Sequence, residues 1–256
     1  MTKPFLLVQL SDPHIGATWT RSDPAARWQA AIRSVARMPD PPDVVLVSGD
    51  LVEHGTDDEY AVVKSALDAL DVPAHVLPGN HDDRARLRKH FRLGGEAEEP
   101  VHYAADLGPC RLVVIDTTTP GRDSGQIEGR QLEWLEAALA AAPDETTVLA
   151  MHHPPFATGM RAWDAIGLAP SDRAALSDVI GRHPNVVRIL AGHVHCPLTA
   201  ELAGCVALSA PSTYVQARPR FEADELDLSD ESAAFAVHAV QGADVVSFVQ
   251  PVTIHP

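Results

Sequence analysis

Five short polar motifs in this chain each follow directly on a run of apolar, largely β-branched residues. They are Asp-Pro-His at 12–14, Gly-Asp at 49–50, Gly-Asn-His-Asp at 79–82, His-His-Pro at 152–154 and Gly-His-Val-His at 192–195. Short apolar runs of this kind are typical of buried strands, so each motif is expected at the carboxyl end of a strand. In open α/β sheets that edge is where ligands bind. The fold must therefore gather five strand ends at one place.

The segments between the motifs carry helical signals. Residues 24–38 and 57–70 have apolar side chains at helical spacing, and Asp23 with Pro24 marks the first helix start. Alternating strands and helices predict parallel strands joined by right-handed crossovers. The expected strands are 5–10, 44–47, 74–77, 101–105, 111–115, 148–151, 186–190, 199–202, 206–209, 234–240 and 245–249, and the expected helices are 24–38, 57–70, 83–91, 127–142 and 171–180.

The domain organisation follows from length and from the segments without periodicity. A chain of 256 residues favours one α/β domain over 1–256. A long aperiodic loop is uncommon in a compact domain unless it is functional, so we interpret segment 153–170 as an active-site cap. The polar insert 218–232 is expected to be an exposed excursion. The terminal strands, within 234–250, are expected to finish the second sheet of their own chain, with pairing to another subunit as the alternative.

The charge balance restricts the partners. Twenty basic residues against 35 acidic ones give a net charge of −15. A surface of this sign repels phosphate backbones, so no nucleic acid polymer is expected as a partner. Three cysteines without a C-x-x-C spacing fit a reducing compartment. The N-terminal residues run into the first strand, and no apolar segment approaches membrane-spanning length. We therefore expect a cytoplasmic protein that does not associate with membranes.

The side chains of the motifs are of the kinds that bind metal ions. They supply three oxygens and four nitrogens, a mixture that suits hard and borderline cations. Seven ligands are too many for one catalytic ion, but they suit two ions if one carboxylate bridges them. In Asp-x-His and His-x-His, an extended backbone would turn both side chains to one side. The residues are Asp12, His14, Asp50, Asn80, His152, His193 and His195. A single structural zinc at 192–195 stays open as an alternative, although it leaves Asp12, Asp50 and Asn80 unexplained.

The ordered set of motifs resembles the calcineurin-like metallophosphoesterase superfamily. The resemblance runs from residue 5 to about residue 213 and includes every ligand position. Leu-Ser-Asp-Pro-His-Ile at 10–15 and His-His-Pro-Pro-Phe-Ala-Thr-Gly-Met at 152–160 are most similar to a bacterial group of cyclic-nucleotide phosphodiesterases and glycerophosphodiesterases. The resemblance implies an α/β fold, a four-layered α/β/β/α sandwich of two mixed sheets flanked by helices.

The resemblance also implies roles by position. Two metal ions, chosen from iron, manganese, zinc and cobalt, are the expected cofactors. A hydroxide bridging them would attack phosphorus opposite the leaving oxygen. His81 is expected to face the phosphate and to stabilise charge or protonate the leaving alkoxide. The expected ligands are Asp12, His14 and His195 for the first ion, Asn80, His152 and His193 for the second, and Asp50 as the bridge.

Four further side chains lie near these motifs in the sequence. His153 is expected to point away from the metals, into the interface with the cap. Glu53 is expected either to orient His81 or to be an ordinary exposed acid. Phe156 and Trp163 could stack a nucleobase, with packing of the cap as the alternative.

The expected activity is that of a metal-dependent phosphoric diester hydrolase acting on a small phosphodiester. Cyclic 3',5'-AMP is the first choice, a glycerophosphodiester the second and a phosphomonoester the third. A scaffold that keeps the fold to bind a protein is the non-enzyme alternative, and it would be expected to lack ligands. A homodimer or higher homo-oligomer is expected by analogy with the family.

Overall fold

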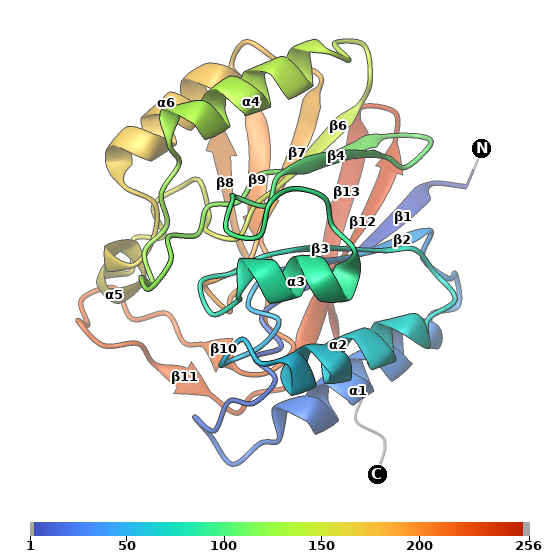
Figure 1. Ribbon diagram of the computed structural model, residues 1–256, viewed down its shortest axis with the longest axis vertical. Coiled ribbons are helices and arrows are strands. Elements are labelled where there is room, and N and C mark those ends of the chain that lie inside the picture. The colour runs from blue at the N-terminus through green and yellow to red at the C-terminus, as the bar shows by residue number, and fades with distance from the viewer. Residues whose placement is uncertain (1–2, 253–256) are drawn as a thin grey trace.

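The computed structural model describes residues 3–252, which form two large mixed sheets with helices on their outer faces (Figure 1). The first sheet has the strand order β13-β12-β1-β2-β3, and the second has the order β4-β5-β6-β7-β9-β8. The strands are β1 (Phe5–Leu10), β2 (Val44–Ser48), β3 (Ala74–Leu77), β4 (Tyr103–Asp106), β5 (Arg111–Val114), β6 (Thr147–Ala150), β7 (Val186–Ala191), β8 (Leu198–Leu202), β9 (Cys205–Ser209), β10 (Gln216–Ala217), β11 (Leu228–Ser229), β12 (Ala234–Gln241) and β13 (Asp244–Pro251). The helices are α1 (Pro24–Ala36), α2 (Asp57–Asp68), α3 (Arg84–Phe91), α4 (Gly129–Ala140), α5 (Arg161–Ala165) and α6 (Pro170–Ile180).

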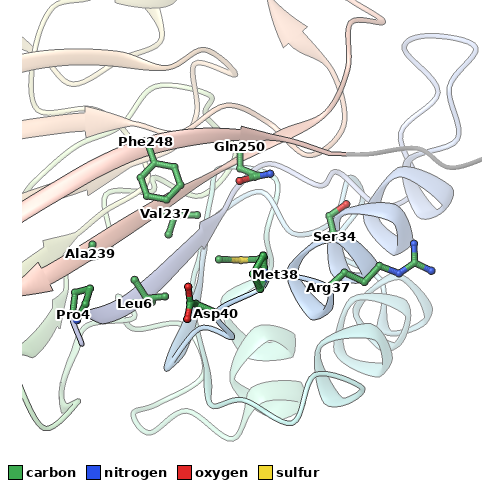
Figure 2. A pocket seen from close by; sticks show the side chains of 11 residues that line it. Pro4, Leu6, Ser34, Arg37, Met38, Asp40, Val237, Ala239, Phe248 and Gln250 are labelled. Atoms are coloured by element: carbon green, nitrogen blue, oxygen red, sulfur yellow. The ribbon is translucent and has the colours of Figure 1, made fainter. Parts of the chain in front are cut away.

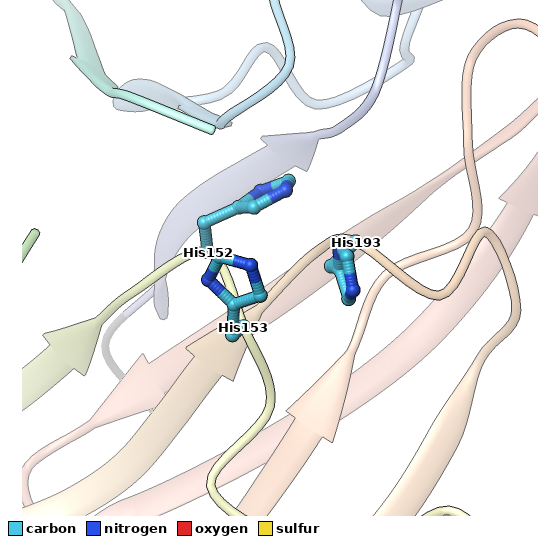
Figure 3. Close-up of side chains that lie close together, drawn as sticks. All are labelled: His152, His153 and His193. Carbon is cyan, nitrogen blue, oxygen red and sulfur yellow. The ribbon is translucent and has the colours of Figure 1, made fainter. Parts of the chain in front are cut away.

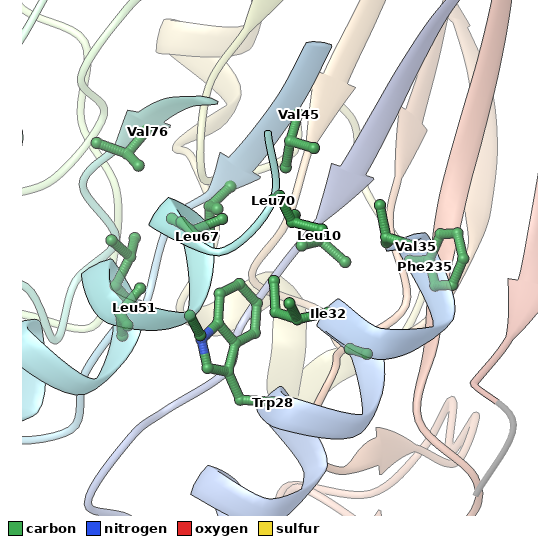
Figure 4. Close-up of a cluster of buried hydrophobic side chains, with 14 of the residues drawn as sticks. Leu10, Trp28, Ile32, Val35, Val45, Leu51, Leu67, Leu70, Val76 and Phe235 are labelled. Carbon is green, nitrogen blue, oxygen red and sulfur yellow. The ribbon is translucent and has the colours of Figure 1, made fainter. Parts of the chain in front are cut away.

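The first sheet is built from parallel strands whose connecting helices begin at capped positions. β1 pairs in parallel with β2, and β2 with β3. The Asp23 side chain accepts a hydrogen bond from Ala25 N at the start of α1, and Thr56 forms a capping box with Glu59 at the start of α2. The helices cover the outer face of this sheet through an apolar cluster around Trp28 (Figure 4). The predicted β-α-β-α-β unit is confirmed.

The second sheet completes a four-layered arrangement. β5, β6, β7 and β9 run parallel to one another, with β4 and β8 antiparallel at the two edges. α4 and α6 pack on its outer face through residues such as Leu135 and Leu176. A separate apolar layer, including Leu7, Leu46 and Leu190, lies between the two sheets. The predicted α/β/β/α sandwich is confirmed.

The two terminal strands complete a sheet of their own chain, as expected, but this is the first sheet and not the predicted second one. β12 pairs antiparallel with β1, and β13 pairs antiparallel with β12. In the parallel set β1-β2-β3, β1 is an end strand with one free edge. β12 satisfies the backbone groups of that edge, which local sequence patterns could not reveal.

The cap segment and the polar insert lie next to each other, at the left of Figure 1. The cap contains the short helix α5, which the aperiodic sequence did not predict. The Arg161 guanidinium at the start of α5 pairs with Glu222 and Asp224 of the insert. The insert forms the antiparallel β10–β11 pair, and Ser229 within it is buried. The insert is therefore only partly the exposed excursion that was predicted, because one side of it packs against the cap.

A hollow of about 540 Å³ lies beside the C-terminal end of α1 (Figure 2). Leu6, Met38, Val237 and Phe248 contribute to its walls, and none of the predicted site residues does. No helix within residues 3–252 has the length and apolar character needed to cross a bilayer.

Candidate metal centre

The predicted ligands follow the strands that end at one edge of the two sheets. Asp12 and His14 follow β1, Asp50 follows β2 and Asn80 follows β3. From the second sheet, residue 152 follows β6, and residues 193 and 195 follow β7. Since the carboxyl ends of parallel strands meet at the same edge, the two sheets bring their motifs together there.

One group of ligand atoms gathers around His14. Its Nε2 atom lies 3.1 Å from His195 Nε2 and 3.5 Å from Asp50 Oδ2. His195 Nε2 lies 3.8 Å from Asp12 Oδ1. These four side chains are buried. They correspond to the set predicted for the first ion.

A second group gathers around the Asn80 amide. Asn80 Oδ1 lies 3.2 Å from His152 Nε2 and 3.1 Å from His193 Nδ1. The Asp50 Oδ2 atom lies 3.3 Å from His152 Nε2 and so reaches this group as well as the first. The other carboxylate oxygen, Oδ1, accepts a hydrogen bond from His81 N at 2.9 Å. A single oxygen of Asp50 therefore lies between the two groups.

The backbone at these positions differs from the extended conformation that the sequence predicted. The φ angle is 51° at Asp12, 43° at His14, 49° at Asp50, 70° at His193 and 49° at His195. All five lie in the left-handed region, which costs a non-glycine residue about 1–2 kcal/mol. Aspartate and histidine tolerate this region better than β-branched residues. Strained turns, rather than alternation along a strand, direct these side chains to one side, and such strain is typical of functional sites.

Two glycines allow the close approach of these turns. A Cβ atom on Gly79 would lie 2.1 Å from Asp50 Oδ1. A Cβ atom on Gly49, whose φ angle is +96°, would lie 2.2 Å from His152 Nδ1. Any side chain at either position would displace a predicted ligand.

The facing rings of His14 and His195 provide a test of whether a cation fits. His195 Nδ1 lies 2.9 Å from Val215 O, and His14 Nδ1 lies 3.1 Å from Glu53 Oε2. Both acceptors are oxygens, so both Nδ1 atoms carry protons, and in neutral rings both Nε2 atoms present lone pairs. Two lone pairs 3.1 Å apart require a positive charge between them, either a proton shared by the two rings or a metal cation. The residues present therefore fit a metal ion.

The protonation of the other side chains follows from burial and charge. Burial, together with the His14 ring, lowers the pKa of His195 to about 3. Burial also opposes ionisation of Asp50, but His152 and His14 outweigh it and hold the pKa of the carboxyl well below its usual range. Burial likewise disfavours a charged His152, yet Asp50 raises the pKa of that ring to about 9. A cation at Asp50 would thus have to compete with a proton on His152, so its binding weakens as pH falls.

Comparison with protein families agrees with this geometry. The family model for calcineurin-like phosphoesterases matches residues 5–197. The chain belongs to this family. It is accordingly a metal-dependent phosphoesterase, and the resemblance seen in its motifs is confirmed.

Several relatives are similar over most of this phosphoesterase. A probable cyclic nucleotide phosphodiesterase of Rhodococcus erythropolis is 35% identical, covering 82% of this chain and 71% of the relative. A probable glycerophosphodiester phosphodiesterase of Arcobacter nitrofigilis is 31% identical, with coverages of 81% and 78%. A 3',5'-cyclic adenosine monophosphate phosphodiesterase of Pseudomonas aeruginosa is 31% identical, with coverages of 84% and 78%.

The fold is shared with solved structures of low sequence identity. A dimetal phosphatase from Danio rerio has a TM-score of 0.72 at 18% identity, covering 98% of this chain and 100% of the other. A purple acid phosphatase from yellow lupin has a TM-score of 0.74 at 15% identity, covering 98% of this chain and 52% of the other.

His153 of the phosphoesterase lies beside the predicted ligands His152 and His193, with a ring nitrogen within 4.8 Å of theirs. Figure 3 shows the rings of His152 and His153 pointing in different directions, with His193 beside them. The His153 Nδ1 atom lies 2.8 Å from Thr117 Oγ1, and Nε2 lies 3.0 Å from Asp123 O. Its ring is centred 4.4 Å from that of His193. Hydrogen bonds thus hold both of its nitrogens, and it contacts the loop that carries Thr117 and Asp123.

Glu53 is the second residue whose role the sequence left open. Its side chain is only 13% exposed, so it is not an ordinary surface acid. Its Oε2 atom lies 3.1 Å from His14 Nδ1 and 3.4 Å from His81 Nδ1, and its Oε1 atom accepts a hydrogen bond from Trp19 Nε1. Glu53 therefore orients a predicted ligand and also contacts His81. Its contact with His14 was not predicted, because the chain has no local signal for it.

A cavity of about 280 Å³ opens over the predicted ligands. The partly exposed His81 and the cap residue Trp163 line it, whereas Phe156 packs on the outer core of the second sheet. Trp19 also lines the cavity, with its ring centred 4.3 Å from that of His14. Trp19 was not among the predicted site residues, although it lies five residues after His14 in the first motif loop. The remaining lining residues are His14, Asp50, Asn80, Asp123, Ile166, His193, His195, Leu226 and Leu228.

Proposed function

We propose that this phosphoesterase hydrolyses a small phosphodiester at a centre of two metal ions, with 3',5'-cyclic AMP as the leading substrate. The observation that carries the proposal is the position of Asp50 Oδ2, 3.5 Å from His14 Nε2 and 3.3 Å from His152 Nε2. One carboxylate oxygen shared by two ligand groups suits two ions better than one. It also argues against a single structural zinc at 192–195.

The ligands would divide as the geometry groups them. When bound, the two ions would stabilise the charge of the phosphoryl oxygens and lower the pKa of a bound water. In the proposed assignment, Asp12, His14 and His195 hold the first ion, Asn80, His152 and His193 hold the second, and Asp50 contacts both.

His81 would act on the substrate. Its Nδ1 atom lies 3.3 Å from Glu53 O, which leaves Nε2 as the nitrogen that can donate to a group in the cavity. A proton donor at this place can protonate the leaving alkoxide. One ring nitrogen of His81 also lies within 4.8 Å of a ring nitrogen of His14 and a carboxylate oxygen of Asp50. His81 would therefore act directly beside the metals.

Two features support a diester with a small organic group. Trp19, Trp163 and Ile166 give the cavity an apolar wall beside the polar ligands. The relatives named as cyclic nucleotide phosphodiesterases support cyclic AMP in particular.

A glycerophosphodiester is the second candidate, favoured by one observation. The carboxylate-bearing residue Asp123 lines the cavity and could bind the cationic group of glycerophosphocholine. Turnover of cyclic AMP and of glycerophosphocholine should be compared in the wild type and in Asp123→Asn. Preferential loss of the choline diester in the variant would favour the second candidate.

The test of the metal centre uses Asn80→Ala and His152→Ala. We expect both variants to retain the circular dichroism spectrum of the fold and to lose hydrolysis of a nitrophenyl phosphodiester. His75→Ala, in β3 upstream of the site, is the matched control and should keep its activity. Full activity of the two variants after metal removal would overturn the proposal.

The expected homo-oligomer remains a prediction. The exposed strand β13 presents Val246 and Phe248, which makes it the first surface to test if light scattering shows a dimer.

A further inference from the structure

Gln9 is a buried amide within the apolar layer between the two sheets. It lies in β1, on the same face as Leu7, and is fully buried. Leu46, its register partner in β2, belongs to this layer. A buried amide costs free energy unless every polar atom is hydrogen-bonded, whereas a leucine would continue the layer without that cost. The amide must therefore contribute something other than apolar burial.

Every polar atom of the Gln9 side chain has a partner, and the partners come from both sheets. The Nε2 group donates to Ser48 Oγ in β2 and to Ala191 O at the end of β7, both at 2.8 Å. The Oε1 atom lies 3.1 Å from His238 Nε2, and His238 Nδ1 lies 2.8 Å from Ser247 Oγ. One side chain thus connects β1, β2 and β12 of the first sheet to β7 of the second.

This hydrogen-bond network continues directly into the turns that carry the proposed ligands. Ser48 Oγ lies 2.7 Å from Ser11 Oγ, and residue 11 precedes the ligand Asp12. Ser48 O accepts a hydrogen bond from His152 Nδ1 at 2.9 Å. On the other side, Ala191 is followed by Gly192, where a Cβ atom would lie 2.3 Å from Ser11 Oγ. Near Gln9, the turn after β7 thus lies directly against the turn after β1.

The two halves of the centre belong to different sheets. Asp12 and Asp50 follow strands of the first, whereas His152 and His193 follow strands of the second. Apolar contacts between sheets are non-directional and tolerate small sliding movements. Hydrogen bonds restrict distance and angle far more narrowly.

We propose that Gln9 is a positioning residue that fixes the two sheets relative to each other beneath the metal centre. It sets the separation between the ligands of the first sheet and those of the second. This inference rests on the proposed metal centre, because it assigns Gln9 a role in metal affinity.

The test compares Gln9→Met with Leu7→Met, a change on the same face of the same strand that removes no hydrogen bond. For each protein, the midpoint of thermal unfolding is measured after chelation and again with added Mn²⁺. The increase on adding metal reports metal affinity, because a ligand that binds only the folded state stabilises it. We expect Gln9→Met to bind Mn²⁺ at least about tenfold more weakly, which lowers the metal-linked stabilisation by about 1.4 kcal/mol. Leu7→Met should retain the wild-type increase.

A purely structural role would give a different result. Gln9→Met would then lower the thermal midpoint equally with and without Mn²⁺. The increase in its midpoint on adding Mn²⁺ would match that of Leu7→Met. This result would overturn the positioning role. If the wild type itself gains no stability from metal, the proposed centre fails instead. Should Gln9→Met not fold, Ser48→Ala removes one hydroxyl of the network and is judged by the same comparison.

Discussion

Replacement of His238 by glutamine should change how strongly the stability of this protein depends on pH. His238 is 2% exposed and lies between the sheets. Since the Oε1 atom of Gln9 can only accept, the proton of the neutral ring lies on Nε2, and Nδ1 accepts from Ser247. Burial, with a smaller contribution from Arg188, lowers the pKa of His238 to about 3.

The sign and size of the effect follow from proton counting. In an unfolded chain, a histidine titrates near its ordinary pKa of 6.5. Between about pH 6.5 and pH 3, the unfolded chain binds a proton at His238 that the folded chain does not, so stability falls as pH falls. One proton corresponds to about 1.4 kcal/mol per pH unit. Glutamine offers Gln9 a donor and Ser247 an acceptor but does not titrate.

The assay is urea unfolding of chelator-treated wild type and His238→Gln between about pH 7 and pH 4.5. All other titrating groups are common to both proteins, so the difference between the two slopes isolates His238. Below about pH 5.5, we expect the free energy of unfolding of the wild type to fall by up to about 1.4 kcal/mol more per pH unit than that of His238→Gln. Parallel slopes would refute the reasoning, since they would mean that folded His238 accepts a proton as readily as the unfolded residue.

Two further outcomes are expected. In Gly79→Ala the new Cβ atom would lie 2.2 Å from the backbone atom Asp50 N. The rate of hydrolysis should therefore fall at least about 100-fold, which corresponds to an increase of about 2.7 kcal/mol in the activation free energy. In Gly94→Ala the new Cβ atom meets nothing within 4 Å, so this control should keep the wild-type rate of hydrolysis. Equal rates in the two variants would contradict the inference that Gly79 is needed for the close approach of Asp50. Removal of metal by a chelator should abolish hydrolysis and lower the thermal midpoint, and added Mn²⁺ should restore both, because a bound metal would supply positive charge between the facing nitrogens of His14 and His195. An unchanged midpoint would count against the metal centre.

Local signals predicted most elements of the fold. β1 and β3 have the predicted bounds, since a polar motif or turn residues flank each apolar run. α1 starts at Pro24, as the preceding Asp23 cap indicated, but ends at Ala36, two residues earlier than predicted. Helix ends are less well specified by sequence than capped starts, because the last turn frays.

The sequence by itself determined which side chains reach the carboxyl edge of the sheets and that they are of metal-binding kinds. Apolar runs and caps act over a few residues, so they can be read without knowing the fold. Only the tertiary structure decided that Glu53 meets His14, that Trp19 enters the cavity and that β12 pairs with β1. It also decided the left-handed backbone at Asp50. These features depend on contacts between distant segments, whose packing energy overrides local preference.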